Sequence, residues 1–161
     1  MKKLLTLNLF LAVIGAILVA ICAIPSFDIY ATDGTLLTNM NLFVATFGGS
    51  VTATEWAANP IVLTLCPGLL VSFILLVVSV VLNLLRYKVK AASLLASLTY
   101  VAAGVLLFTS LPLLEAANFN VTLSEASYNF AILATPIVIG VLECVLGLLS
   151  ICDSAVVLSK K

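Results

Sequence analysis

The sequence predicts an all-α integral membrane protein, folded as a four-transmembrane-helix antiparallel bundle with a small extracellular β-meander between the first two helices. The first observation is composition. The chain has 161 residues, of which 63% are hydrophobic and only 9% charged, whereas about 25% of the residues in a soluble domain are charged. A soluble fold of this size has too little interior to hide so much apolar surface. The second observation is four apolar stretches, each long enough for the roughly 20 helical residues that cross a bilayer. They span residues 4–23, 61–85, 91–114 and 130–151.

The positions of the charges predict the orientation. All seven basic residues lie at the N-terminus, in the link between the second and third stretches, or at the C-terminus: Lys2, Lys3, Arg86, Lys88, Lys90, Lys160 and Lys161. Four crossings put these three places on one side, which the positive-inside rule makes cytoplasmic. We therefore expect a multi-pass protein of the cell (plasma) membrane with both termini in the cytoplasm. In the alternative interpretation, "MKK" and the first apolar stretch form a cleaved signal peptide, although the stretch is long for one.

Residues 24–60 form the sizeable polar segment of the chain. Two turn signals, Asp33-Gly34 and Gly48-Gly49, supply the positive φ angles that tight hairpins need. The β-forming runs "FDIYAT", "NMNLFVATF" and "SVTATEW" flank them. We expect a β-meander over the outer end of the bundle. Trp56 follows the last run and is either an interfacial anchor or a contact residue for a partner.

Small and polar residues form one stripe on each predicted helix. On the fourth, Pro136, Gly140, Glu143, Gly147, Ser150 and Ser154 fall within an arc of about 80° at helical spacing. Lipid gives helices no hydrophobic reason to associate, so close backbone approach and interhelical hydrogen bonds must hold them together. The stripes should therefore face inward, and Pro136 should kink the fourth helix. The other three stripes are Ser93, Ser97, Tyr100 and Gly104; Thr64, Gly68, Ser72, Ser79 and Asn83; and Asn8, Ala12, Gly15 and Cys22.

Glu143 is the acid within the fourth apolar stretch, and an ionised carboxylate at the bilayer centre costs on the order of 3 kcal/mol or more. Burial should keep it neutral, and a neutral acid needs a hydrogen-bond partner. Tyr100 has a similar depth when residues are counted from the cytoplasmic ends, so we expect a Tyr100–Glu143 hydrogen bond. Two roles stay open for this intramembrane polar pair: a link between helices, or a proton or cation site.

The remaining chemistry of the chain is sparse. Cys22 and Cys66 both lie near the outer ends of neighbouring helices, so they form either a disulfide or a pair of buried free thiols. Histidine is absent and no Cys/His set suggests a metal site. We find no catalytic or cofactor-binding motif, so we expect neither enzyme activity nor a cofactor. Zero net charge gives no sign of nucleic-acid binding.

The layout resembles that of the claudin-type tetraspan group, which has cytoplasmic termini, a larger β-rich first outer segment, a shorter second one and a brief inner link. The outer signature of that group, a Trp, a Gly-Leu-Trp and two Cys, is absent, because the segment between Pro25 and Pro60 holds only Trp56 and no cysteine. The resemblance is architectural and implies a tetraspan arrangement rather than membership.

These observations favour a non-enzymatic multi-pass membrane protein that acts by association. It would be a homo-oligomer or an accessory subunit of a membrane complex, making contacts through its extracellular β-rich loop and its small-residue helix faces. Its partners are the lipid bilayer and itself or another membrane protein. The alternative is a small oligomeric ion or proton channel or transporter that uses Glu143.

The topology can be tested by labelling. We expect a membrane-impermeant amine reagent to modify Lys88 and Lys161 only after the cells are permeabilised, because both residues lie on the cytoplasmic side. Mass spectrometry of labelled peptides reads the result. Modification of one of the two from outside intact cells would contradict an arrangement of four crossings.

Overall fold

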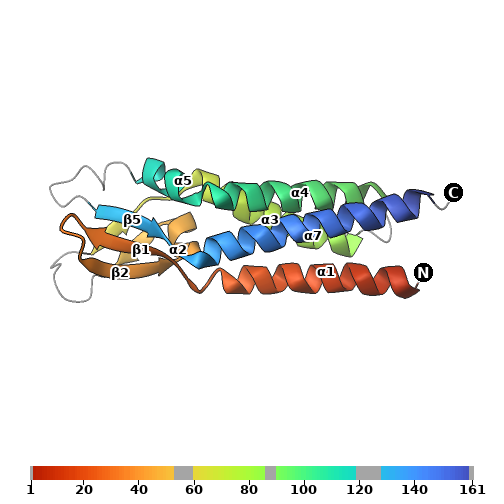
Figure 1. The fold of residues 1–161 in the computed structure, drawn as a ribbon, viewed down its shortest axis with the longest axis horizontal. Helices are drawn as coiled ribbons and strands as arrows, with labels where there is room; N and C mark the ends of the chain where they lie inside the picture. The colour runs from red at the N-terminus through yellow and green to blue at the C-terminus, as the bar shows by residue number, and fades with distance from the viewer. Residues whose placement is uncertain (1, 53–59, 86–89, 119–127, 160–161) are drawn as a thin grey trace.

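Four long helices lie side by side, and two small β-sheets lie at one end of them (Figure 1). The computed structural model describes residues 2–52, 60–85, 90–118 and 128–159. The long helices are α1 (Lys2–Ile21), α3 (Pro67–Leu85), α4 (Lys90–Phe108) and α7 (Ala134–Ser159). We call the end that carries the sheets the sheet end. The start of α1 and the end of α7 lie at the opposite end, which we call the terminal end.

Two of these helices are long and apolar enough to cross a membrane. They are α3 and the part of α7 from Ala134 to Cys152. A third candidate is α4 together with α5 (Ser110–Ala117), which are bent by 66° where they meet. The described apolar part of α1, Leu9–Ile21, is shorter. The described residues thus hold two or three candidate spans. A mostly helical fold with candidate spans and a small sheet is confirmed, whereas the predicted bundle of four spans is not.

The bend between α4 and α5 corrects the prediction of one continuous helix over residues 91–114. Proline has no N–H, so Pro112 cannot donate to the carbonyl four residues earlier in the chain. At the break the Thr109 backbone N–H bonds instead to the Leu106 carbonyl at 3.1 Å, and the Thr109 hydroxyl bonds to the same oxygen at 2.9 Å. α5 therefore leaves the direction of α4.

The small-residue stripes face inward, as predicted. Their buried members are Gly140, Glu143, Gly147 and Ser150 on α7; Ser93, Ser97, Tyr100 and Gly104 on α4; Ser72, Ser79 and Asn83 on α3; and Ala12, Gly15 and Cys22 in or just after α1. Thr64 is exposed and precedes α3, while Asn8 and Ser154 lie outside the residues whose side chains are described. The opposite faces carry large apolar side chains such as Val71, Ile74 and Val81, each about half exposed.

α4 and α7 approach each other most closely, at glycines. A Cβ atom on Gly104 would lie 2.6 Å from the Gly140 carbonyl oxygen and 2.8 Å from Cys144 Sγ. A Cβ on Gly147 would lie 2.9 Å from the Ser97 carbonyl oxygen. Real Cβ atoms do not fit at such distances, so these positions allow backbone-to-backbone contact that a larger residue would prevent.

Pro136 does not kink α7. It is buried and is the third residue of the helix, in the first turn, where the missing N–H would have had no intrahelical partner. The predicted helix over residues 130–151 is displaced, because residues 128–132 form a strand and the helix runs from Ala134 to Ser159. Likewise, residues 61–63 form a strand, and α3 begins only at Pro67.

The larger sheet combines residues from two separate segments. Its strands are β1 (Pro25–Ala31), β2 (Leu36–Asn41) and β5 (Tyr128–Ile132), all antiparallel, in the order β2-β1-β5. The predicted meander within residues 24–60 is therefore wrong in part, because β5 comes from the segment before α7. The second sheet pairs β3 (Gly49–Val51) with β4 (Ile61–Leu63).

The hairpin between β1 and β2 confirms the turn predicted at Asp33-Gly34. Gly34 has φ 83° and its N–H bonds to the Ala31 carbonyl at 3.0 Å. The Thr35 backbone N–H donates to Asp33 Oδ1 at 2.8 Å, which lowers the pKa of that carboxyl below its usual value.

The strand predicted from "NMNLFVATF" is confirmed only for residues 39–41, which end β2; residues 42–47 form a short helix, α2 (Leu42–Phe47). Asn41 Oδ1 accepts the Val44 backbone N–H at 2.9 Å, and Gly48, with φ 76°, ends the helix. Gly48 thus ends a helix and Gly49 begins β3, so the pair does not form the predicted hairpin turn. Trp56 lies outside the described residues.

The glycine contact gives a stability test. Gly104→Leu should lower the free energy of unfolding in detergent by about 1–3 kcal/mol or more, because the side chain would force α4 away from α7. The matched control is Ala102→Leu, at an exposed position on the same helix. Thermal or denaturant unfolding followed by circular dichroism measures both. Equal stability of the two variants would show that the helices do not depend on this contact.

Candidate functional site

Glu143 is the buried charged residue at the centre of the bundle. It lies on α7 with 0% of its side chain exposed, and neither carboxylate oxygen has a hydrogen-bond partner among the described residues. Asn83 and Ser110 are the other described residues with buried side-chain atoms that lack a partner. Burying an unsatisfied polar group costs about 1–3 kcal/mol. Glu143 therefore lowers the free energy of unfolding of the protein.

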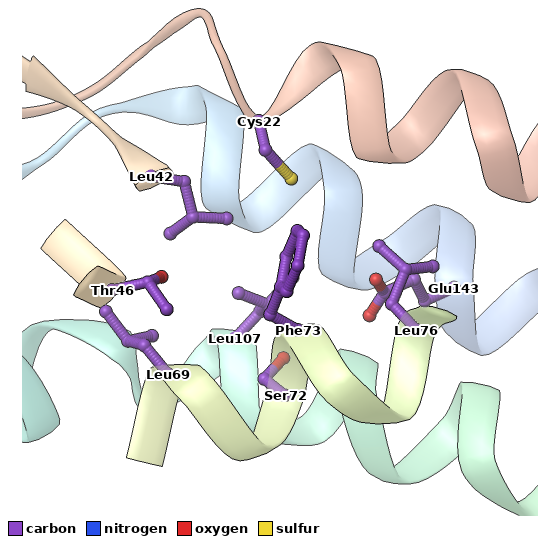
Figure 2. A pocket seen from close by; sticks show the side chains of 9 residues that line it. All are labelled: Cys22, Leu42, Thr46, Leu69, Ser72, Phe73, Leu76, Leu107 and Glu143. Atoms are coloured by element: carbon purple, nitrogen blue, oxygen red, sulfur yellow. The ribbon is translucent and has the colours of Figure 1, made fainter. Parts of the chain in front are cut away.

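A cavity adjoins Glu143 and brings together side chains from four helices and from the turn after α1 (Figure 2). Its polar lining consists of Glu143, Ser72 on α3, Thr46 on α2 and Cys22 just after α1, and the rest is leucine together with Phe73. The space open to the centre of a water-sized group is about 10 Å³, which is about enough for one water molecule. Sequence analysis missed Thr46 altogether, because it assigned that segment to a strand.

α2 covers this cavity at the sheet end. Leu42 and Thr46 are buried and line the cavity. Phe43 and Phe47, the next residue after each of these in α2, make T-shaped contacts with Phe73 on α3, with ring centroids 5.5 and 5.6 Å away. These T-shaped contacts hold α2 against α3 at the sheet end of the bundle.

The predicted Tyr100–Glu143 hydrogen bond is not formed. The Tyr100 hydroxyl donates instead to the Leu11 carbonyl oxygen on α1 at 3.3 Å, and the absence of a side chain at Gly15 leaves room for it. Gly104 lies level with Cys144, so Tyr100, four residues from Gly104, is about 6 Å nearer the terminal end. The depth count failed because α7 continues to Ser159 and does not end near residue 151.

Other buried polar side chains connect the helices. The Ser72 hydroxyl donates to the Ala103 carbonyl oxygen at 3.0 Å, and the Ser79 hydroxyl lies 2.8 Å from Thr99 Oγ1, so both join α3 to α4. Asn83 lies close to the Tyr100 hydroxyl but outside hydrogen-bond geometry. Most inward hydroxyl groups thus act as links between helices, whereas Glu143 does not.

Cys22 and Cys66 are both buried free thiols, so the disulfide considered from the sequence is not formed. Their sulfur atoms point to different neighbours. Cys22 Sγ donates to the Leu18 carbonyl oxygen in the last turn of α1 at 3.3 Å, whereas Cys66 Sγ donates to the Leu113 carbonyl oxygen on α5 at 3.4 Å. Within the described ranges, no group of three or more His, Cys, Asp and Glu side chains is placed to hold a metal ion.

A groove at the sheet end separates the two sheets. Residues 38–41 of β2 form one wall, residues 50–52 in and after β3 form the other, and Val44 of α2 lies between them, with Ala23 and Pro25 completing the lining. Its open volume is about 290 Å³. β2 is an edge strand of the larger sheet, and β3 belongs to a two-stranded sheet. Residues of two edge strands therefore line one polar groove.

No protein-family model, curated protein or solved structure matches this chain. Its functional interpretation therefore rests on its own residues.

The unpaired carboxylate gives a second stability test. Glu143→Met should keep or raise the free energy of unfolding, by up to about 1–3 kcal/mol, because a side chain of similar shape replaces a buried group that no atom of the described residues satisfies. Tyr100→Phe is the contrasting variant and should lower it by about 1 kcal/mol, since it loses the bond to Leu11. Unfolding is measured in detergent without alkali cations, so that only the protein's own groups act on the side chain. A larger loss for Glu143→Met than for Tyr100→Phe would mean that a protein group holds the carboxylate.

Proposed function

We propose that this chain is a non-enzymatic multi-pass membrane protein that acts by association, as a homo-oligomer or as an accessory subunit of a membrane complex. The contact surface is the sheet end. The small-residue helix faces, which the sequence also suggested as contact surfaces, are buried inside the chain's own bundle. These faces pack the helices against one another, so the sheets are the surface that we propose for contact with a partner.

The proposal places all four long helices in the plasma membrane, with α4 and α5 making one bent crossing and both termini in the cytoplasm. Two observations support it. Large apolar side chains cover the outward faces of the helices, as lipid contact requires. The start of α1 and the end of α7, which adjoin basic residues in the sequence, lie together at the end opposite the sheets (Figure 1).

The groove between β2 and β3 is the observation that carries the association proposal. Edge strands present backbone N–H and C=O groups that readily pair with another chain. An extended segment that enters the groove could bond to β2 on one side and to β3 on the other, which is the strand-addition mode of recognition. Exposed apolar residues near the groove, Ile24, Phe47 and Val62, add surface that a partner could cover.

The alternative function is a small oligomeric channel or transporter for ions or protons that uses Glu143. Its support is the unpaired carboxylate beside a cavity. A conduction path requires polar groups along the whole membrane, and Glu143 is the one buried charged side chain among the described residues. Association is therefore our main proposal.

The association surface can be tested by mass measurement of the full chain in mild detergent. We expect a complex larger than the 16.9 kDa chain, either a multiple of that mass or a complex with a second protein. Thr52→Arg places a long charged side chain in the groove and should weaken the complex at least about tenfold.

The matched control is Thr32→Arg, which adds the same side chain at an exposed position in the turn between β1 and β2, away from the groove. It should leave the complex intact. A wild-type chain that is monomeric and without partners, or equal effects of the two variants, would contradict the proposal.

A further inference from the structure

We propose that the cavity beside Glu143 binds a single alkali-metal cation of about the size of Na⁺, reached from the sheet end of the molecule. This site is independent of the association surface, because it lies inside the bundle of one chain. Three properties of the cavity support the proposal: its oxygen atoms, its size and its position.

The cavity is lined by oxygen atoms from three side chains. Alkali cations bind to oxygen ligands, and both oxygens of Glu143 lack a hydrogen-bond partner among the described residues. Ser72 uses its hydroxyl hydrogen on the Ala103 carbonyl, so the lone pairs of its oxygen stay available as acceptors. Thr46, on α2, adds a second hydroxyl to the lining. The three side chains belong to three different helices, and the fold brings them to one cavity (Figure 2).

Size and charge select the class of ligand. About 10 Å³ accommodates the centre of one water-sized group, which excludes an organic molecule or a fully hydrated ion. The remaining lining is apolar, so the occupied site is stable only if it is close to neutral. One carboxylate is neutralised by one monovalent cation, whereas a divalent cation would leave a net positive charge in an apolar cavity.

The position indicates access from one end. Toward the terminal end the interior is filled by buried side chains, including Tyr100, Leu11 and Leu146. Toward the sheet end, the short helix α2 is the element that covers the cavity, and it is attached through its Asn41 cap and its two phenylalanines. Displacement of α2 would open the cavity at the end lined by Leu42 and Thr46. The arrangement fits reversible binding from one side rather than conduction.

Protons compete with sodium for the Glu143 carboxylate, so the response to sodium should depend on pH. Other titratable groups near Glu143 must therefore be considered. The titratable side chains near Glu143 are Cys22, Tyr100 and its neighbour Cys144. α2 and α3 contribute none, since neither helix contains a titratable residue. Thiols and phenols ordinarily stay neutral between about pH 5 and 7.5. A change of sodium response across this range therefore reports on Glu143.

The experiment measures the thermal unfolding of the purified full chain in detergent as Na⁺ replaces choline at constant ionic strength. At neutral pH we expect Tm to rise with sodium concentration and to saturate, as linked binding requires. At about pH 5 more sodium should be needed for the same rise. K⁺, Li⁺ and Ca²⁺ are measured in parallel, and the response to Na⁺ should exceed that to Ca²⁺.

Matched variants locate the effect. Glu143→Gln should abolish the sodium response, whereas Glu115→Gln, which removes an exposed acid on α5, should leave it unchanged. Ser72→Ala should weaken sodium binding about tenfold, while Ser79→Ala, which also removes a hydroxyl bond between α3 and α4 but lies outside the cavity, should not.

If Glu143→Gln does not fold, the Ser72→Ala and Ser79→Ala pair and direct ²³Na NMR binding to the wild-type chain decide the question. The proposal is overturned by a wild-type Tm that is the same in sodium and in choline. It is equally overturned by a stability that depends on pH through Glu143 but on no alkali cation, or by an unchanged sodium response in the folded Glu143→Gln protein.

Discussion

The backbone contact between α4 and α7 is the constraint on which the rest of the structure depends. Gly104 and Gly140 meet where neither could carry a side chain, and this close approach sets how far one helix is displaced along the other. That displacement puts Glu143 level with the cavity and puts Tyr100 about one turn away from it. Apolar side chains alone would not define such a register, because leucine gains no more from another helix than from lipid.

The same contact explains why the bundle interior has both satisfied and unsatisfied polar groups. Serines on tightly packed helices reach the carbonyl oxygens of their neighbours, as Ser72 does at Ala103. Glu143 projects instead toward the junction of α3 with α2 and the end of α1, where the packing leaves a cavity. Proteins keep unsatisfied buried groups mainly where function requires them. Among the described residues, Asn83 and Ser110 also bury polar atoms without a partner, but Glu143 is the one that is a buried acid.

The sheet end joins segments that are far apart in the chain. β5, which precedes α7, pairs with β1, which follows α1. The Thr135 hydroxyl also donates to the Pro25 carbonyl oxygen at 2.7 Å, so the strand and the helix after it are tied to the same neighbour. A two-stranded hairpin would be marginal by itself, and the third strand and the helices beneath it supply the missing burial. Phe27 and Ile29, central in β1, are fully buried there.

Length, hydropathy and helical spacing in the sequence by themselves determined the long helices, the inward direction of their small residues, the turn at Asp33-Gly34 and the burial of Glu143. These are local properties, because one apolar stretch or one glycine is enough to produce each of them. Only the tertiary structure decided the partner of Tyr100, the pairing of β5 with β1, the helical state of residues 42–47 and the lining of the cavity by Thr46 and Ser72. Each of these depends on the displacement between elements that are distant in sequence. That displacement is fixed by side-chain fit between helices and strands, which no pattern along a single stretch records.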